Sequence, residues 1–123
     1  MATNELLRVT LDIDPPTWGT NDAEKRLAIR REITKHVPDF GENYVAGLLE
    51  HCEALEIEIN CHLVNPESKD VDNLAKIPID AVFFSARNES GYHTWEAKIT
   101  SLLVRKIPDQ QNKLGIVLRS TSR

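Results

Sequence analysis

The sequence predicts an α/β fold: a single domain whose mixed β-sheet of about four strands is flanked by about three helices. Apolar residues alternate with polar ones over 7–13 and again over 55–63, which is the period of a half-buried strand. Between these segments Ile29, Ile33 and Val37 recur at four-residue spacing, which is typical of an amphipathic helix. A length of 123 residues fits one domain over residues 1–123.

Proline and glycine residues mark the boundaries of the expected elements. Pro15 and Pro16 end the first strand because proline cannot donate to a strand ladder, and Pro38 closes the first helix. Along the strand expected over 95–107, Ile99 and Leu103 should share one face. In order, we expect a strand over 7–13, helices over 23–36 and 43–53, a strand over 55–63, a helix from Asp72, and strands over 95–107 and 113–119.

Composition argues against several classes of protein. No apolar run approaches the roughly 20 residues that span a bilayer, and residues 1–5 lack the basic start and apolar core of a secretory signal, so we expect a cytoplasmic protein without membrane contact. Cys52 and Cys61 do not suggest a disulfide framework. Neither glycine-rich phosphate-binding motif, that of the P-loop or that of the dinucleotide fold, is present, and we expect no organic cofactor.

The charges are segregated along the chain. The net charge is −4, which argues against nucleic-acid binding if taken as an average. Residues 39–58 contain six acids and no Lys or Arg, whereas residues 98–123 contain six Lys or Arg and one acid. Residues 25–35 contain five Lys or Arg and one acid. A local positive surface is therefore expected despite the acidic total.

The segment from Asp70 to Lys76 carries the clearest functional signal. Asp72 is suited to be a helix N-cap, because a carboxylate accepts the free amide hydrogens of the first turn. Lys76 would then lie one turn on, on the same face, with Asp70 just outside the helix. Carboxylates suit a hard cation such as Mg²⁺, and a lysine suits the charge of a phosphoryl transition state. The grouping predicts metal-assisted phosphodiester cleavage; the alternative is a capping aspartate beside a solvated aspartate and a surface lysine.

Pro78 falls inside the helix expected from Asp72. At that depth proline removes a backbone hydrogen bond and crowds the carbonyl of Leu74. We therefore expect a kink, or an early end with a restart toward Phe84. Either would shift Lys76 relative to the two aspartates.

The pattern Asp70-x-Asp72-Asn73-x-x-Lys76, followed by Asp80-Ala81, resembles the signature of the RusA family of Holliday-junction resolvases, which are small metal-dependent endonucleases. Residues 9–16 resemble the family's opening strand and Pro-Pro turn, residues 56–62 the strand that delivers the acidic loop, and residues 95–106 the strand that follows. The likeness spans nearly the whole chain with its motifs in the same order. It implies a RusA-like endonuclease domain.

The resemblance also implies a third carboxylate. In the family it comes from an Asp-Asp pair that opens the strand after the metal-binding helix. Here Glu96 aligns with the second acid of that pair and Trp95 replaces the first, so Asp70, Asp72 and Glu96 are the implied metal ligands. A looser alternative combines Asp80 with Glu96-x-Lys98, a degenerate pattern of restriction-type nucleases. Glu96 and Lys98 as ordinary exposed strand residues are the third alternative.

The implied function is hydrolysis of phosphodiester bonds in four-way junctions or related branched DNA, in recombination and repair. Mg²⁺ is the implied cofactor, with Mn²⁺ able to replace it, and Lys76 would stabilise transition-state charge. Lys69 and Lys76 are the expected DNA contacts, and a homodimer would let two sites nick symmetry-related strands. The alternative is a catalytically weak or inactive homologue that binds branched DNA or serves as a protein-interaction domain, favoured by Trp95, Pro78 and the acidic total.

Overall fold

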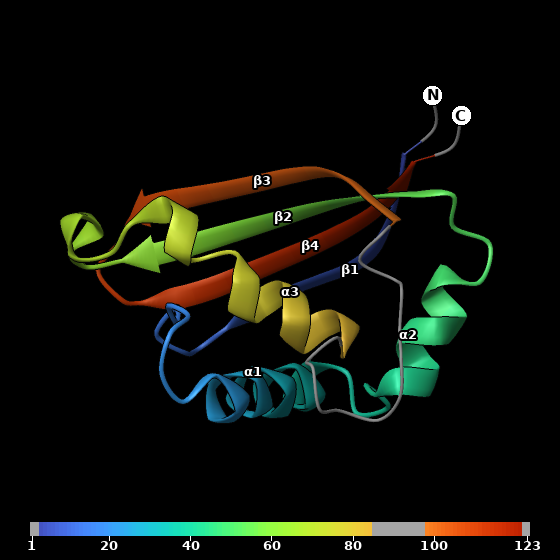
Figure 1. Ribbon diagram of the computed structural model, residues 1–123, viewed down its shortest axis with the longest axis horizontal. Coiled ribbons are helices and arrows are strands. Elements are labelled where there is room, and N and C mark those ends of the chain that lie inside the picture. Colours follow the sequence, from blue (N-terminus) through green and yellow to red (C-terminus); the bar gives the residue numbers. More distant parts are fainter. Residues whose placement is uncertain (1–2, 85–97, 122–123) are drawn as a thin grey trace.

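The computed structural model describes residues 3–84 and 98–121 and has three helices lying on one side of a four-stranded mixed sheet (Figure 1). The predicted fold class is therefore confirmed. The elements are β1 (Thr3–Leu11), α1 (Asp22–His36), α2 (Glu42–Leu49), β2 (Ala54–Leu63), the short 3₁₀ turns η1 (Pro66–Ser68) and η2 (Val71–Asn73), α3 (Lys76–Phe83), β3 (Ile99–Pro108) and β4 (Lys113–Thr121). None of the helices in these two ranges is long and apolar enough to cross a membrane.

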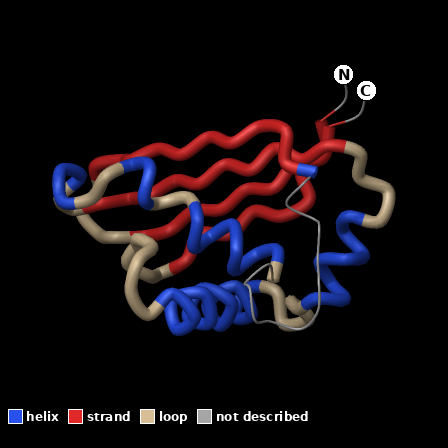
Figure 2. Tube along the Cα trace, viewed as in Figure 1, coloured by secondary structure: helices blue, strands red, loops and turns tan. Residues whose placement is uncertain are grey.

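The strands follow the spatial order β1-β4-β2-β3. β4 is antiparallel to both of its neighbours, whereas β2 and β3 are parallel. Parallel neighbours cannot be joined by a tight turn, so the chain must cross over between them. That crossover includes η1 and η2, near the end of β2, and α3, which lies on the helical side of the sheet (Figure 2). The acidic segment 70–76 therefore lies in this crossover, after the end of β2 and after η1.

The core lies between the sheet and the helices. Along β2 every second residue from Leu55 to Leu63 is fully buried, which confirms the predicted alternation. Ile29 and Ile33 of α1 and Phe83 of α3 are likewise buried in the same cluster. Each such side chain contributes roughly 1.5–3 kcal/mol when it leaves water, so the two helices are held to the sheet mainly by apolar burial.

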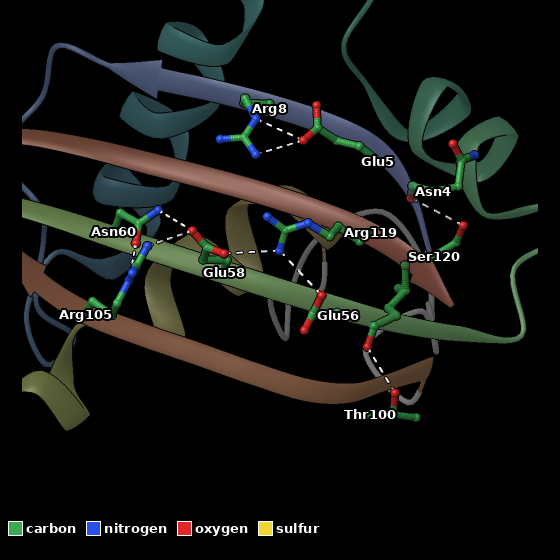
Figure 3. Close-up of polar contacts among 11 residues, drawn as sticks. Asn4, Glu5, Arg8, Glu56, Glu58, Asn60, Thr100, Arg105, Arg119 and Ser120 are labelled. Atoms are coloured by element: carbon green, nitrogen blue, oxygen red, sulfur yellow. Dashed lines mark hydrogen bonds and ion pairs between the residues drawn. The ribbon is translucent and has the colours of Figure 1, made fainter. Parts of the chain in front are cut away.

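The opposite face of the sheet is open and carries a network of ion pairs (Figure 3). Arg119 of β4 donates to Glu58 at 3.1 Å and to Glu56 at 3.4 Å, and Arg105 of β3 lies 3.0 Å from Glu58. Asn60 donates to Glu58 at 2.7 Å, and this hydrogen bond, with the two arginines, holds the pKa of the Glu58 carboxyl below its usual value. We call Glu56, Glu58, Asn60, Arg105 and Arg119 the sheet-face network.

A β-bulge corrects one prediction about β3. Leu55 pairs with Ile99, but the next residue of β2, Glu56, pairs with Ser101, so Thr100 is the extra residue. Because side chains alternate along a strand, one extra residue exchanges the faces of everything after it. Leu103 is consequently opposite Glu58 on the open face and is 43% exposed, and its predicted place on the same face as Ile99 is wrong.

Candidate functional site

The crossover begins with two 3₁₀ turns, η1 and η2, and the acidic segment contains the second of them before α3 starts. Asn73 donates its amide to the carbonyl of Asp70 at 3.1 Å, and Leu74 donates to Val71 at 3.2 Å, which closes η2. α3 starts after Ala75. Asp72 therefore lies inside η2 and does not cap the helix, so the predicted N-cap is wrong. The side chain of Asp72 is exposed and makes no capping hydrogen bond to α3.

Pro78 does not kink the helix. It is the third residue of α3. The next residue, Ile79, donates its amide to the carbonyl of Ala75 at 3.2 Å. The first amides of any α-helix have no partner within the helix, so a residue without an N–H is tolerated at this depth. The predicted kink is wrong because the helix begins later than expected. The helix itself runs unbroken through Pro78.

Two lysines hold the acidic segment in place. Lys106 of β3 donates to the carbonyl of Pro66 at 2.8 Å and to that of Lys69 at 2.9 Å. Lys69 in turn points toward the loop between β1 and α1, where its ammonium lies 2.8 Å from the carboxylate of Asp14 and also donates to the carbonyl of Pro15. Its side chain is only 18% exposed. These contacts give Lys69 a positioning role, and its predicted DNA contact stays a prediction.

A pocket of about 340 Å³ lies where α3 begins. Its lining residues are Trp18, Asp72, Ala75, Lys76, Ile79 and Asp80. The structure thus brings Asp72 and Lys76 to the wall of one pocket. Asp70, which is exposed, is not among the described residues that line it. The pocket combines the apolar side chains of Ala75 and Ile79 and the indole of Trp18 with charged groups of both signs.

Lys76 and Asp80 form an ion pair across one turn of α3. The ammonium lies 3.4 Å from the Asp80 carboxylate, whose side chain is 8% exposed, whereas that of Lys76 is 59% exposed. The nearly buried acid thus holds an exposed cation beside the pocket. Spacing of four residues is the sequence signal that indicates such a pair. Arg30 of α1 fixes this stretch by donating to the carbonyls of Ala81 at 3.0 Å and Asp80 at 3.3 Å.

Asp70 and Asp72 differ from the other acids near them. Both are exposed, and within residues 3–84 and 98–121 neither carboxylate accepts a hydrogen bond or forms an ion pair with a protein group. The two lie two positions apart in a segment whose backbone is fixed by Lys106 and by the η2 hydrogen bonds. Two carboxylates in a fixed segment without a cationic protein partner are available to a cation from solution.

The donor chemistry of this segment fits Mg²⁺, which is commonly bound through one or two carboxylates and completes its shell with water and substrate phosphate. In the described ranges no group of three or more His, Cys, Asp or Glu side chains gathers closely enough to hold a metal ion. The third implied ligand, Glu96, and its neighbour Trp95 lie outside the described residues. Of the three predicted ligands, the described residues therefore include Asp70 and Asp72, which lie two positions apart in the same segment.

The alternative that combines Asp80 with Glu96-x-Lys98 stays a prediction, because Glu96 lies outside the described residues. The ammonium of Lys98 donates to the carbonyl of Cys52 at 2.8 Å, just before the start of β2, whereas the acidic segment follows the end of that strand. Asp80 is paired with Lys76. Cys61 of β2 is fully buried in the core, and this burial raises the pKa of its thiol to about 11, although the charge of Lys69 lowers it in part.

Several of the basic residues expected to form a positive surface bind groups of the protein itself. Arg105 and Arg119 belong to the sheet-face network, and Lys98 and Lys106 donate to backbone carbonyls. In α1, Arg30 donates to α3 and its guanidinium lies 4.1 Å from the ring centre of Phe84. These basic residues thus serve as structural contacts.

No protein-family model and no curated protein matches this chain. The resemblance to RusA resolvases therefore depends on motif order and on the acid–acid–lysine grouping. Sequence reasoning assigned no role to Trp18, which lines the pocket and is 51% exposed. An aromatic residue in a loop between a strand and a helix, just after Pro15-Pro16, is the only sequence signal that pointed to it.

Proposed function

We propose that this protein is a metal-dependent endonuclease that hydrolyses phosphodiester bonds in four-way junctions or related branched DNA. One observation carries the proposal. Asp70 and Asp72 are exposed acids without a protein partner in the described ranges, in a fixed segment that also leads to the pocket holding Lys76. Purely structural acids of this chain, such as Glu56 and Glu58, are instead paired with arginine.

Asp70 and Asp72, together with Glu96, would bind Mg²⁺ or Mn²⁺. When bound, such an ion lowers the pKa of an attacking water and polarises a phosphoryl oxygen. Lys76 would stabilise negative charge on the phosphoryl group, since its ammonium is exposed beside Asp72. Asp80 would act as a positioning residue that orients Lys76 through the 3.4 Å ion pair.

Two further parts of the proposal concern the assembly and its setting. Four-way junctions have strands related by two-fold symmetry, and a homodimer with two such sites matches that symmetry. We therefore propose a homodimer acting in DNA recombination or repair, in the cytoplasm. Lys69 and Lys76 are proposed as phosphate contacts, Lys76 being the more exposed of the two.

The test is a cleavage assay on a synthetic four-way junction with Mg²⁺, comparing the wild type with Asp72→Asn. We expect cleavage by the wild type, its loss on chelation, its return with Mn²⁺, and a large decrease in the variant. Asp39→Asn, which changes an exposed aspartate between α1 and α2, is the matched control and should cleave normally. Equal rates for the wild type and Asp72→Asn would remove the acidic segment from the mechanism.

A second candidate is a catalytically inactive homologue that binds branched DNA or another protein. It is favoured by the contacts of Arg105, Arg119 and Lys106, each of which binds a carboxylate or a backbone carbonyl of the protein itself. Tight junction binding without cleavage in any divalent metal would support the DNA-binding form. Absence of DNA binding even at low salt would support a protein-interaction domain, because phosphate contacts strengthen as salt falls.

A further inference from the structure

Trp18 presents an indole beside the proposed catalytic groups. Its side chain lines the same pocket as Asp72 and Lys76, and the residue is 51% exposed. Tryptophan offers a large, flat apolar face with a polar N–H at its edge, and such side chains are enriched at binding interfaces. The structure therefore offers an aromatic face next to the position where we propose that a phosphate is cleaved.

The backbone on both sides of Trp18 is fixed. Lys25 of α1 donates to the carbonyl of Thr17, and the amide of Gly19 donates to the carboxylate of Asp22 at 2.8 Å. Gly19 has a φ of 140°, a conformation that residues with a Cβ rarely adopt. The turn after Trp18 thus requires glycine. The indole is presented on a loop whose backbone is already ordered, which lowers the entropy cost of binding.

The same loop is tied to the acidic segment. Asp14 and Pro15, upstream of Trp18, both accept hydrogen bonds from the ammonium of Lys69. Lys69 directly precedes Asp70. One lysine therefore sets the position of the Trp18 loop relative to the proposed metal ligands.

The pocket beside Trp18 has the size and chemistry of a nucleotide site. Its volume of about 340 Å³ lies at the lower end of the range for small-molecule sites, roughly 300–1,000 Å³. Ala75 and Ile79 provide apolar lining, and Lys76 provides a cation for a phosphate. A planar base against the indole, with its phosphate toward Lys76, would match the apolar and cationic parts of the lining, and the carboxylates of Asp72 and Asp80 form the rest of it.

From this arrangement we propose that Trp18 is a stacking platform for one unstacked nucleobase next to the scissile phosphate. The inference rests on the proposed nuclease function and adds to it a specificity-determining residue. Bases inside a continuous duplex are stacked on both faces, whereas a branch point or a single strand can expose a base face to an aromatic side chain. Trp18 would thus favour branched or single-stranded DNA over continuous duplex.

The binding test uses the fluorescence of Trp18 in a Trp95→Phe protein, which leaves one tryptophan. The protein is titrated without metal, at low salt, with a single-stranded oligonucleotide, a four-way junction and a continuous duplex. We expect quenching by the first two and much weaker quenching by the duplex. Equal quenching by all three, or none by the junction, would overturn the stacking role.

The cleavage test compares Trp18→Ala and Trp18→Phe with Leu27→Ala, a control that removes another exposed apolar side chain, from α1. Loss of one base–aromatic stack should lower kcat/KM on the junction roughly tenfold to a hundredfold, and phenylalanine should restore most of it. Thermal melts would verify that each variant folds. If Trp18→Ala cleaves junctions as fast as the wild type, the stacking role fails while the nuclease function stands.

The opposite combination separates the two proposals. If the wild type cleaves no DNA in any divalent metal, yet the junction and the single strand quench Trp18 and the duplex does not, the nuclease function fails. The stacking role then stands, on a protein that binds branched DNA without cutting it.

Discussion

The open sheet face and the acidic segment use the same kind of residue in opposite ways. On the sheet face, Glu56 and Glu58 each meet the guanidinium of Arg119, and Glu58 meets Arg105 as well (Figure 3). In the acidic segment, Asp70 and Asp72 meet no cationic protein group within the described ranges. Residue type and net charge are therefore poor guides to function here. What distinguishes the two regions is whether the fold supplies the counter-charge.

This difference separates stability from activity. Acids paired inside the fold contribute to folding, and removing one leaves its partner unsatisfied. Exposed acids without a partner contribute little to folding and repel each other slightly, so removing one should leave stability unchanged or raise it. Substitutions on the sheet face should thus lower stability and leave the proposed cleavage rate unchanged, whereas substitutions in the acidic segment should do the reverse.

The largest effect is expected at Asp70. Asp70→Asn should lower the rate of junction cleavage about a hundredfold or more, because a neutral amide is a poor ligand for a hard cation. The thermal midpoint should stay within about 2 °C of the wild type, since surface changes of this kind are usually within ±0.5 kcal/mol. Glu56→Gln is the control from the sheet face, and its cleavage rate should equal that of the wild type. A rate loss shared by both variants would break the contrast.

The next effect concerns the Lys76–Asp80 pair. Lys76→Gln should lower the cleavage rate roughly ten- to a hundredfold by removing the cation that faces the phosphoryl group. Lys76→Arg keeps the charge but moves it, and should retain an intermediate rate. Rates would be measured at saturating substrate, so that a loss in kcat is separated from a loss in binding. Unchanged kcat in Lys76→Gln would assign Lys76 to DNA binding alone.

A stability effect is expected at the centre of the sheet-face network. The Glu58 side chain is 13% exposed and accepts from Asn60, Arg105 and Arg119. Glu58→Gln should lower the free energy of unfolding at pH 7 by about 1.5 kcal/mol, the scale of hydrogen bonds to charged groups. Cleavage should be unaffected. Urea unfolding followed by circular dichroism measures the difference.

The same carboxyl predicts a pH dependence. The pKa of Glu58 is lowered from 4.5 in the folded protein, first by the hydrogen bond from Asn60 and also by Arg119 and Arg105. Since the folded state favours the ionised form, this stabilisation is fully present above pH 4.5 and is lost as pH falls below it. The difference in stability between the wild type and Glu58→Gln should therefore shrink between about pH 5 and pH 3. A difference that stays constant over that range would show that the network does not depend on this charge.

Local patterns were sufficient to predict the sheet and its core, and insufficient for the site. The alternation in β2 predicts that the segment is a strand and also which of its faces is buried, because only every second residue packs against the helices. Asp72 could cap an α-helix or lie in a 3₁₀ turn, and the local sequence favours the two almost equally. The outcome depends on which backbone hydrogen bonds form over these few residues. The bulge at Thr100 depends on how β3 pairs with β2, which no single-strand pattern contains.

The roles of Lys69 and Trp18 depend on contacts distant in sequence. Lys69 meets Asp14 across 55 positions, so nothing in its own neighbourhood indicates that its ammonium points inward. Trp18 lines the pocket together with residues of α3, which follow it by more than fifty positions. The closeness of Asp72 and Lys76 could be predicted because the two are near in sequence, whereas their link to the Trp18 loop could not.

The smallest effect is expected at Lys69. A substitution there tests whether this cation near the acidic segment contacts DNA phosphate or only holds the segment in place. Lys69→Met keeps the apolar stem but removes the donors to Asp14 and Pro15. If Lys69 positions the segment, cleavage should fall only a few-fold and the salt dependence of junction binding should not change. If it contacts phosphate, binding should weaken and its salt dependence should become shallower by about one counterion. Binding isotherms at several salt concentrations distinguish these two roles of Lys69.

Lys113→Met is the control for this experiment. It removes a half-buried lysine at the start of β4 and so measures the effect of losing one positive charge elsewhere in the protein.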